Sequence, residues 1–150
     1  MNAAAELGQI LKAHGWTIGC AESCTGGLLT STLTDIDGSS AYVKGGVISY
    51  ATAVKIELLK VRAETVERFT VVSEQTALEM ALGVRRLLGV DVGLSTTGYA
   101  GPTGDDVGLV CIGFSTADRN VAQRFCFEGD RKEIKSLAVE AAIDFAIKNI

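Results

Sequence analysis

Histidine, proline and tryptophan each occur once in this 150-residue sequence, and the single histidine restricts the available chemistry. A metal site with several imidazole ligands is excluded, and His14 is the only imidazole base. His14 precedes Ser23 by nine residues and lies at the opposite end of an expected strand, so a Ser-His-Asp triad is not favoured. We expect no metal ion and no cofactor, and interpret His14 as a polar residue before the first strand.

The sequence also lacks paired cysteines, long apolar runs and an excess of basic charge. Its four cysteines form no CxxC pair, which favours free thiols in a reducing compartment. No uncharged run approaches the roughly 18 residues of a membrane helix, and no basic leader precedes an apolar stretch. With 14 Lys plus Arg against 18 Asp plus Glu, the net charge is −4. We expect a cytoplasmic protein that binds neither a membrane nor nucleic acid.

Composition favours one compact domain over residues 1–150. Hydrophobic residues make up 47% and charged residues 21% of the chain, as in folded soluble proteins. A chain of this length buries roughly 70% of its unfolded surface around one core. The apolar helices of so small a chain also predict a homo-oligomer.

Helical and strand patterns alternate along the chain. Apolar spacing and capping residues predict helices over about 2–14, 26–36, 52–59, 64–69, 73–89 and 130–146. Short apolar runs predict strands over about 16–21, 45–50, 90–96, 107–115 and 121–128, the last two as an antiparallel hairpin. This alternation with one late hairpin predicts a three-layer α/β/α domain with a mixed sheet.

The stretch Ala21–Gly27, AESCTGG, falls where the first strand turns into the second helix. Unpaired N–H groups and the helix dipole favour an anion or an oxyanion at such a turn. A simpler interpretation is that Ser23 or Thr25 is only the helix N-cap and that the glycines allow close packing. The sequence leaves both interpretations open.

A second Gly-rich loop, residues 97–106, follows another expected strand. The two loops can line one crevice if their strands are parallel neighbours. Neither loop has the lysine of a P-loop or the GxGxxG spacing of a dinucleotide fingerprint, so ATP hydrolysis and dinucleotide binding are weakly supported.

A serine nucleophile activated by a lysine, directly or through a tyrosine, needs no histidine. Tyr50 and Lys55 flank the start of a helix at the level expected for Ser23. A neutral lysine at pH 7 needs its pKa lowered by about 3 units, which requires a partly desolvated site. Lys55 as a solvated or phosphate-binding cation, and Tyr50 as a packed residue, remain alternatives. Cys24 competes with Ser23, since a thiol at a helix N-terminus has a lowered pKa.

Several motifs in order resemble the CinA C-terminal domain family, which includes stand-alone nicotinamide mononucleotide amidohydrolases. They are AESCTGG at 21–27, GSS at 38–40, GGVISY at 45–50, VSEQTALEMALGVR at 72–85, STTGYAGP at 95–102 and GDR at 129–131. The resemblance implies metal-free hydrolysis of the carboxamide of nicotinamide mononucleotide, a pyridine mononucleotide, to nicotinic acid mononucleotide and ammonia.

The resemblance also implies roles for individual residues. Ser23 is expected to be the nucleophile, with Tyr50 and Lys55 moving protons and helix N–H groups near Thr25 stabilising the oxyanion. Arg131 is expected to take the substrate phosphate. Further contacts with the substrate are expected from Glu22, Cys24, Thr25, Gly26, Gly27, Gly46, Thr97, Gly98 and Gly101.

One segment departs from the family. After Gly101-Pro102 the loop is short and carries Asp105 and Asp106, where relatives have a longer loop with a Lys-Pro pair, and Thr52 stands where many have Asn. Aspartates facing a phosphate would repel it. The alternatives are therefore a catalytically weak nucleotide-binding module of the same fold and, less favoured, thiol chemistry at Cys24.

Overall fold

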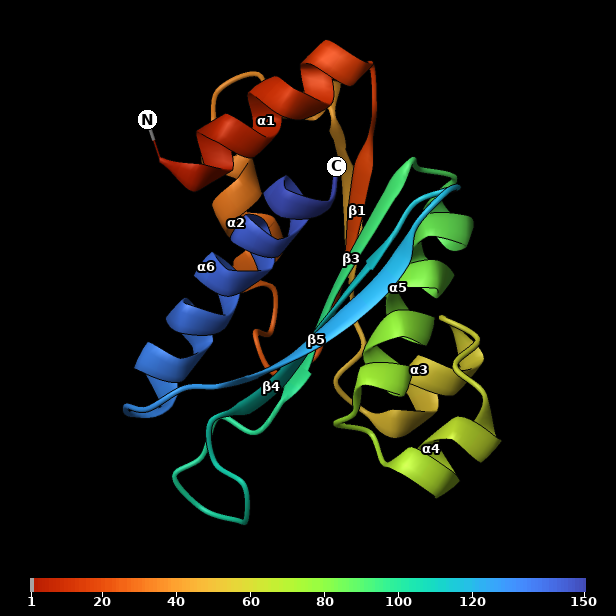
Figure 1. Cartoon of the computed structure of the whole chain (residues 1–150), viewed down its shortest axis with the longest axis vertical. Helices are drawn as coiled ribbons and strands as arrows, with labels where there is room; N and C mark the ends of the chain where they lie inside the picture. Colours follow the sequence, from red (N-terminus) through yellow and green to blue (C-terminus); the bar gives the residue numbers. More distant parts are fainter. Residues whose placement is uncertain (1) are drawn as a thin grey trace.

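The computed structural model describes residues 2–150; Met1, where the expected domain begins, lies outside them. The strands are β1 (Ile18–Glu22), β2 (Val43–Ile48), β3 (Val92–Gly98), β4 (Leu109–Ser115) and β5 (Asn120–Cys126). The helices are α1 (Ala3–His14), α2 (Leu28–Thr34), α3 (Thr52–Glu57), α4 (Ala63–Phe69), α5 (Glu74–Leu88) and α6 (Arg131–Asn149), with a short 3₁₀ helix, η1 (Ser39–Ala41). Helices α1, α2 and α6 cover one face of the sheet, and α3, α4 and α5 lie on the other (Figure 1). The expected three-layer α/β fold is confirmed.

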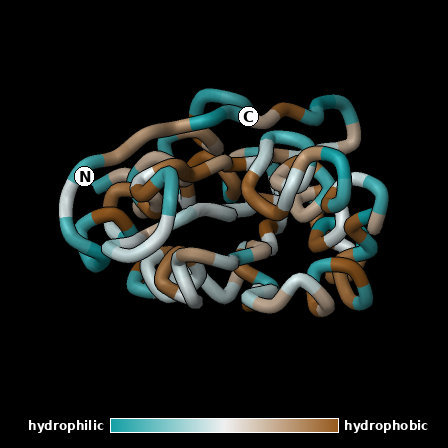
Figure 2. The backbone as a smooth tube through the Cα atoms, turned by 90° about the horizontal axis from the view of Figure 1, so that it is seen from below, coloured by the Kyte–Doolittle hydropathy of each residue, from teal (hydrophilic) through white to brown (hydrophobic). Residues whose placement is uncertain are grey.

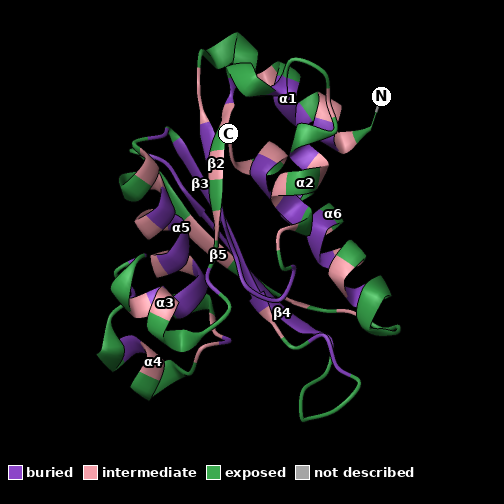
Figure 3. Ribbon diagram, turned by 180° about the vertical axis from the view of Figure 1, so that it is seen from behind, coloured by how far each residue is buried: buried purple, intermediate pink, exposed green. Residues whose placement is uncertain are grey.

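The sheet has the strand order β2-β1-β3-β4-β5. β1 runs parallel to both β2 and β3, whereas β4 and β5 continue the sheet as antiparallel strands. All residues of β1 and β4 are buried because helices cover both faces of the centre of the sheet (Figure 3). The parallel pairing of β1 and β3 places their carboxyl ends, and the loops that follow them, side by side.

Capping chemistry decides where the three longest helices, α1, α5 and α6, begin, and glycines end α1 and α5. Ser73 accepts a hydrogen bond from Thr76 N at the start of α5. Asp130 and Glu133 form a capping box at the start of α6. Gly15 and Gly89, with φ of 67° and 64°, end α1 and α5 in the left-handed conformation.

Two helix starts differ from expectation. Helix α2 begins at Leu28 rather than near 26, because Gly26 and Gly27 have φ of 59° and 104° and are not helical. Thr52 is the first residue of α3 rather than its N-cap, which is Ala51 and makes no side-chain capping bond.

The largest core lies between the sheet and the layer of α1, α2 and α6, where Ile18, Leu94 and Phe114 pack among helix side chains. On the other face, α5 approaches the sheet closely: a Cβ at Gly93 or Gly113 would overlap a backbone carbonyl oxygen of α5. Hydrophilic residues lie mainly on the outer loops (Figure 2). In residues 2–150, no helix combines the length and the apolar character needed to span a bilayer.

Candidate active site

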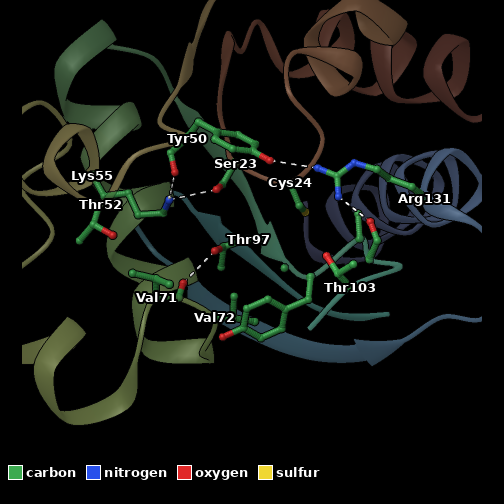
Figure 4. Close-up of a pocket in the computed structure, with 14 residues that line it drawn as sticks. Ser23, Cys24, Tyr50, Thr52, Lys55, Val71, Val72, Thr97, Thr103 and Arg131 are labelled. Carbon is green, nitrogen blue, oxygen red and sulfur yellow. Dashed lines mark hydrogen bonds between the residues drawn. The ribbon is translucent and has the colours of Figure 1, made fainter. Parts of the chain in front are cut away.

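A cavity of about 240 Å³ opens beyond the carboxyl ends of β1 and β3 (Figure 4). The two polar loops expected to form one crevice do so, because their strands are parallel neighbours. Its walls are formed by Ser23, Cys24, Tyr50, Thr52, Lys55, Val71, Val72, Thr97, Gly98, Tyr99, Ala100, Gly101, Thr103 and Arg131. The cavity therefore contains the three residues expected to be catalytic and five of those expected to bind substrate.

Ser23 and Lys55 are in direct contact. Ser23 follows β1, and its backbone N–H donates to the carbonyl of Thr96 at 3.0 Å. Lys55 extends from α3, and its Nζ lies 3.0 Å from Ser23 Oγ (Figure 4). The structure thus joins a hydroxyl and an amine that are 32 positions apart in the sequence.

The surroundings of Lys55 disfavour its charged form. The side chain is only 2% exposed, and burial lowers the pKa of its ammonium group below the usual 10.5. Nζ donates to two backbone carbonyls, Ser49 O at 2.7 Å and Tyr50 O at 3.2 Å. Nζ also lies within donor distance of Ser23 Oγ, so the ammonium form has three acceptors. A neutral amine has two N–H groups, and if the two carbonyls accept both of them, its lone pair is left for Ser23.

Tyr50 is placed differently from the expected proton relay. Its backbone carbonyl contacts Lys55, but its side chain is 60% exposed and its hydroxyl accepts a hydrogen bond from Arg131 at 3.0 Å. The geometry therefore does not support a proton path through the Tyr50 hydroxyl, because Lys55 reaches Ser23 without an intermediary.

Arg131 bridges two loops at the mouth of the cavity. It is the first residue of α6, and its guanidinium donates to Gly101 O at 2.6 Å and to the Tyr50 hydroxyl. Gly101 has a φ of 72°, a conformation that favours glycine. Binding of a phosphate by Arg131 stays a prediction.

Five residues expected to contact substrate do not line the cavity: Glu22, Thr25, Gly26, Gly27 and Gly46. The side chain of Glu22 is only 1% exposed, and its carboxylate accepts the N–H groups of Gly27, Leu29 and Thr30 instead of facing the cavity. The donors at the start of α2 therefore hold a carboxylate of the protein itself. Gly46 provides room for Thr30, whose Oγ1 would lie 2.5 Å from an added Cβ.

The Glu22 contacts also change the expected oxyanion site. Gly27 is the N-cap of α2 and makes no side-chain capping bond, so neither Ser23 nor Thr25 is the N-cap. Among the described residues, the backbone N–H of Cys24 donates to no other residue, and Cys24 lines the cavity. This N–H, directly after Ser23, is a candidate for stabilising an oxyanion.

The Cys24 thiol lacks the activation expected at a helix N-terminus. Burial, with a smaller contribution from the negative charge of Glu22, raises the pKa of Cys24 to about 12. The helix dipole does not act on it directly, since α2 begins at Leu28. All four cysteines are free, and Cys20, Cys24 and Cys111 are buried.

Sequence reasoning missed part of the cavity wall: Thr52, Val71 and Val72. Tyr99, Ala100 and Thr103 also line the cavity and belong to the expected loop 97–106, but they were not singled out. Val71 is fixed there because its carbonyl accepts a hydrogen bond from Thr97 Oγ1 at 2.8 Å. In the sequence, this part of the wall is marked only by an apolar Val71-Val72 pair before the N-cap of α5.

His14 lies on α1, where Nδ1 is 2.9 Å from Ile10 O. Within residues 2–150, no group of three or more His, Cys, Asp or Glu side chains is arranged to hold a metal ion.

Comparisons with known proteins agree with this fold. The model of the CinA C-terminal domain family matches residues 1–150. The sequence is 44% identical over 148 residues to the nicotinamide-nucleotide amidohydrolase PncC of Enterobacter agglomerans, covering 95% of this chain and 90% of that protein. The fold matches the crystal structure of the competence damage-inducible protein A (ComA) of Klebsiella pneumoniae with a TM-score of 0.94 and 34% identity, over 98% of this chain and 94% of that one.

Other relatives are much longer than this chain. A CinA-like protein of Chloroherpeton thalassium is 44% identical over 92% of this chain, yet the match covers only 35% of that protein. The chain spans about a third of the length of several such relatives, of which it covers 34% or 35%.

Proposed function

The chain belongs to the CinA C-terminal domain family, and we propose that it hydrolyses the carboxamide of nicotinamide mononucleotide to nicotinic acid mononucleotide and ammonia. The observation that carries the proposal is the 3.0 Å contact between Ser23 Oγ and Lys55 Nζ inside a cavity. The similarity to PncC over nearly its whole length supports the choice of substrate.

In the proposed first half-reaction, Ser23 Oγ bonds to the carboxamide carbon while its proton moves to neutral Lys55 Nζ. The former carbonyl oxygen becomes an oxyanion, which the Cys24 N–H stabilises. The C–N bond then breaks as Lys55 returns its proton to the amide nitrogen. Ammonia leaves, and an ester joins the pyridine carbonyl to Ser23.

The second half-reaction uses the same two residues. Water attacks the ester carbon and gives a proton to Lys55 Nζ. When the bond from Ser23 Oγ to this carbon breaks, Lys55 protonates Oγ and the carboxylic acid product is released. Each half-reaction moves one proton onto Lys55 and one off it, so the enzyme returns to its starting state without a further reactant.

In this proposal the cavity mouth orients the nucleotide. The Arg131 guanidinium, already directed between two loops by Gly101 and Tyr50, interacts with the phosphate. Thr97 and Gly98, at the end of β3, bound the space near Ser23 in which the pyridine ring lies.

The test is ammonia release from nicotinamide mononucleotide by the purified protein and three variants. Ser23→Ala and Lys55→Ala are expected to lose activity by about a hundredfold or more, the scale for removal of a nucleophile or a positioned base. Cys24→Ala is the matched control from the adjacent position and is expected to keep most of the activity, since its thiol is buried and protonated.

Two other outcomes would contradict the proposal. Saturable binding of the nucleotide without ammonia release identifies a binding module. Loss of activity in Cys24→Ala with retention in Ser23→Ala identifies thiol chemistry.

A further inference from the structure

The carboxylate of Glu22 organises the chain segment that follows it. Oε1 accepts hydrogen bonds from Thr25 Oγ1 at 2.6 Å, Gly27 N at 3.1 Å and Leu29 N at 2.8 Å. Oε2 accepts from Thr30 N at 2.8 Å and Thr30 Oγ1 at 2.7 Å. Hydrogen bonds to an ionised acceptor are stronger than neutral ones, and burial of the carboxylate excludes competing water. The turn after β1 is therefore folded around this carboxylate.

The backbone of Glu22 is connected to the proposed base. Its carbonyl accepts hydrogen bonds from Ser49 N at 2.7 Å and Ser49 Oγ at 3.2 Å. The carbonyl of Ser49 in turn accepts from Lys55 Nζ at 2.7 Å. Ser49 thus connects Lys55 to the backbone of the residue whose carboxylate folds the turn.

A third connection ties the same turn to β3. The Thr25 hydroxyl donates to Glu22, so its oxygen is free to accept a hydrogen bond from Thr96 Oγ1 at 2.8 Å. The Thr96 carbonyl accepts from the backbone N–H of Ser23 at 3.0 Å. Glu22, Thr25 and Thr96 are all buried and form a closed ring of contacts with Ser23.

We infer that Glu22 is a positioning residue that holds Ser23 Oγ at hydrogen-bond distance from Lys55 Nζ without touching substrate. The expected loss of activity rests on the proposed function. The expected change in the distance between Ser23 and Lys55 is independent of any substrate. In Glu22→Gln, an amide NH₂ replaces one acceptor and faces N–H or O–H donors of the turn. The turn must shift to avoid this donor–donor contact, and Ser23 shifts with it.

Glu79 supplies a matched control. Its carboxylate accepts hydrogen bonds from Arg62 N at 2.8 Å and Thr65 Oγ1 at 2.5 Å, so it holds the start of α4 by the same chemistry. Glu79 does not line the cavity. Glu79→Gln therefore introduces the same substitution at another helix start without the connection to Ser23.

The experiment compares Glu22→Gln with Glu79→Gln by steady-state kinetics on nicotinamide mononucleotide and by crystal structures. In Glu22→Gln we expect kcat to fall by about 10- to 100-fold with KM unchanged, because small misplacements of reacting groups have effects of this size. We expect the distance from Ser23 Oγ to Lys55 Nζ to exceed hydrogen-bond range. Glu79→Gln should keep the parent kcat and the parent distance.

The milder pair Thr25→Val and Thr25→Ser covers the case in which Glu22→Gln does not fold. Valine removes the hydroxyl that links Glu22 to Thr96, whereas serine retains it, so kcat should fall in the first variant and recover in the second. Equal kcat in these two variants would overturn the inference. So would an unchanged Ser23–Lys55 distance with parent kcat in Glu22→Gln.

These readouts separate the two proposals. A parent protein that turns over the substrate, with Glu22→Gln behaving like the parent, refutes the positioning role and leaves the proposed function intact. A parent protein without turnover refutes the proposed function, and the crystallographic distance alone then decides on Glu22.

Discussion

Lys55 is the residue at which burial and chemistry are most closely coupled in this protein. Its ammonium group loses hydration on folding, and this burial lowers the pKa, with a smaller opposing effect from Cys24. The same burial removes the lysine from competing surface contacts and directs it to Ser23. If this lysine were exposed to solvent, it would remain charged and would not accept the serine proton.

The first prediction concerns pH. Because neutral Lys55 is the proposed base, kcat/KM should rise with pH as the ammonium group loses its proton and then level off, with a midpoint below 10.5. The measurement is kcat/KM for nicotinamide mononucleotide from about pH 6 to about pH 10. A profile that falls with pH across this range would show that the charged form is required.

The lowered pKa of Lys55 also makes the stability of the folded protein depend on pH. The folded pKa of Lys55 lies below 10.5, so the unfolded chain binds more protons between the two values and stability rises with pH across that window. Urea unfolding of the parent should show this rise, and Lys55→Met should show less of it.

The direction of individual side chains could not be predicted from the sequence. The order of motifs identified Ser23 and Lys55, but side-chain direction depends on contacts between distant segments. Glu22 points inward to α2 and the Tyr50 hydroxyl points outward to Arg131, and no local pattern distinguishes these directions from their opposites.

At the scale of secondary-structure elements, the packing of α5 against the sheet depends on glycines in β3 and β4. A Cβ at Gly93 would overlap Ala81 O, and Ser95 Oγ donates to Ala77 O at 2.5 Å. The helix therefore lies close to β3, the strand that carries Thr96 and Thr97 to the site.

The second prediction tests this close approach. Gly93→Ala should lower the free energy of unfolding by about 3 kcal/mol, at the upper end of overpacking effects, because the clash is with backbone rather than a flexible side chain. Gly45→Ala is the control, since its Cβ would meet Leu88 Cδ1 at an ordinary 3.5 Å. Urea denaturation of both variants measures the difference, and equal stability would contradict the prediction.

Most elements were predictable because their signals are local. Ser73, Gly89 and Asp130 mark helix ends through chemistry within a few residues. The start of α2 was not predictable in this way, because the donors of its first turn are satisfied by Glu22 from the preceding strand.

At the scale of the whole molecule, the proposed anionic substrate approaches a protein of net charge −4. Asp105 and Asp106 are exposed in the loop between β3 and β4, whose residues Gly101 and Thr103 line the cavity. The third prediction is that Asp105→Asn together with Asp106→Asn lowers KM by about two- to fivefold at low ionic strength, because repulsion of the phosphate is reduced.

Salt provides the check on that prediction. The advantage of the double variant should shrink as ionic strength rises to about 0.15 M, where charges beyond about 8 Å are screened. Asp118→Asn is the control, since Asp118 is exposed in the β4–β5 turn at the opposite end of the sheet. An equal decrease of KM in the control would show a general effect of net charge.

The layer architecture followed from the alternation of strands and helices, whereas the strand order did not. Pairing of β1 with both β2 and β3 joins segments about 25 and 75 positions apart, and their apolar residues fit several neighbours equally well. The sequence predicted a shared crevice only on the condition that β1 and β3 are parallel neighbours, and the structure shows this pairing.

The occupied N-terminus of α2 has a consequence for inhibitor design. Acidic groups are commonly aimed at helix starts, but here Glu22 already fills that position, and a second anion would meet its negative charge. A compound for this cavity should instead carry an electrophile that forms a reversible bond with Ser23 and place its oxygen at the Cys24 N–H. Its anionic end should extend toward Arg131, away from the buried carboxylate.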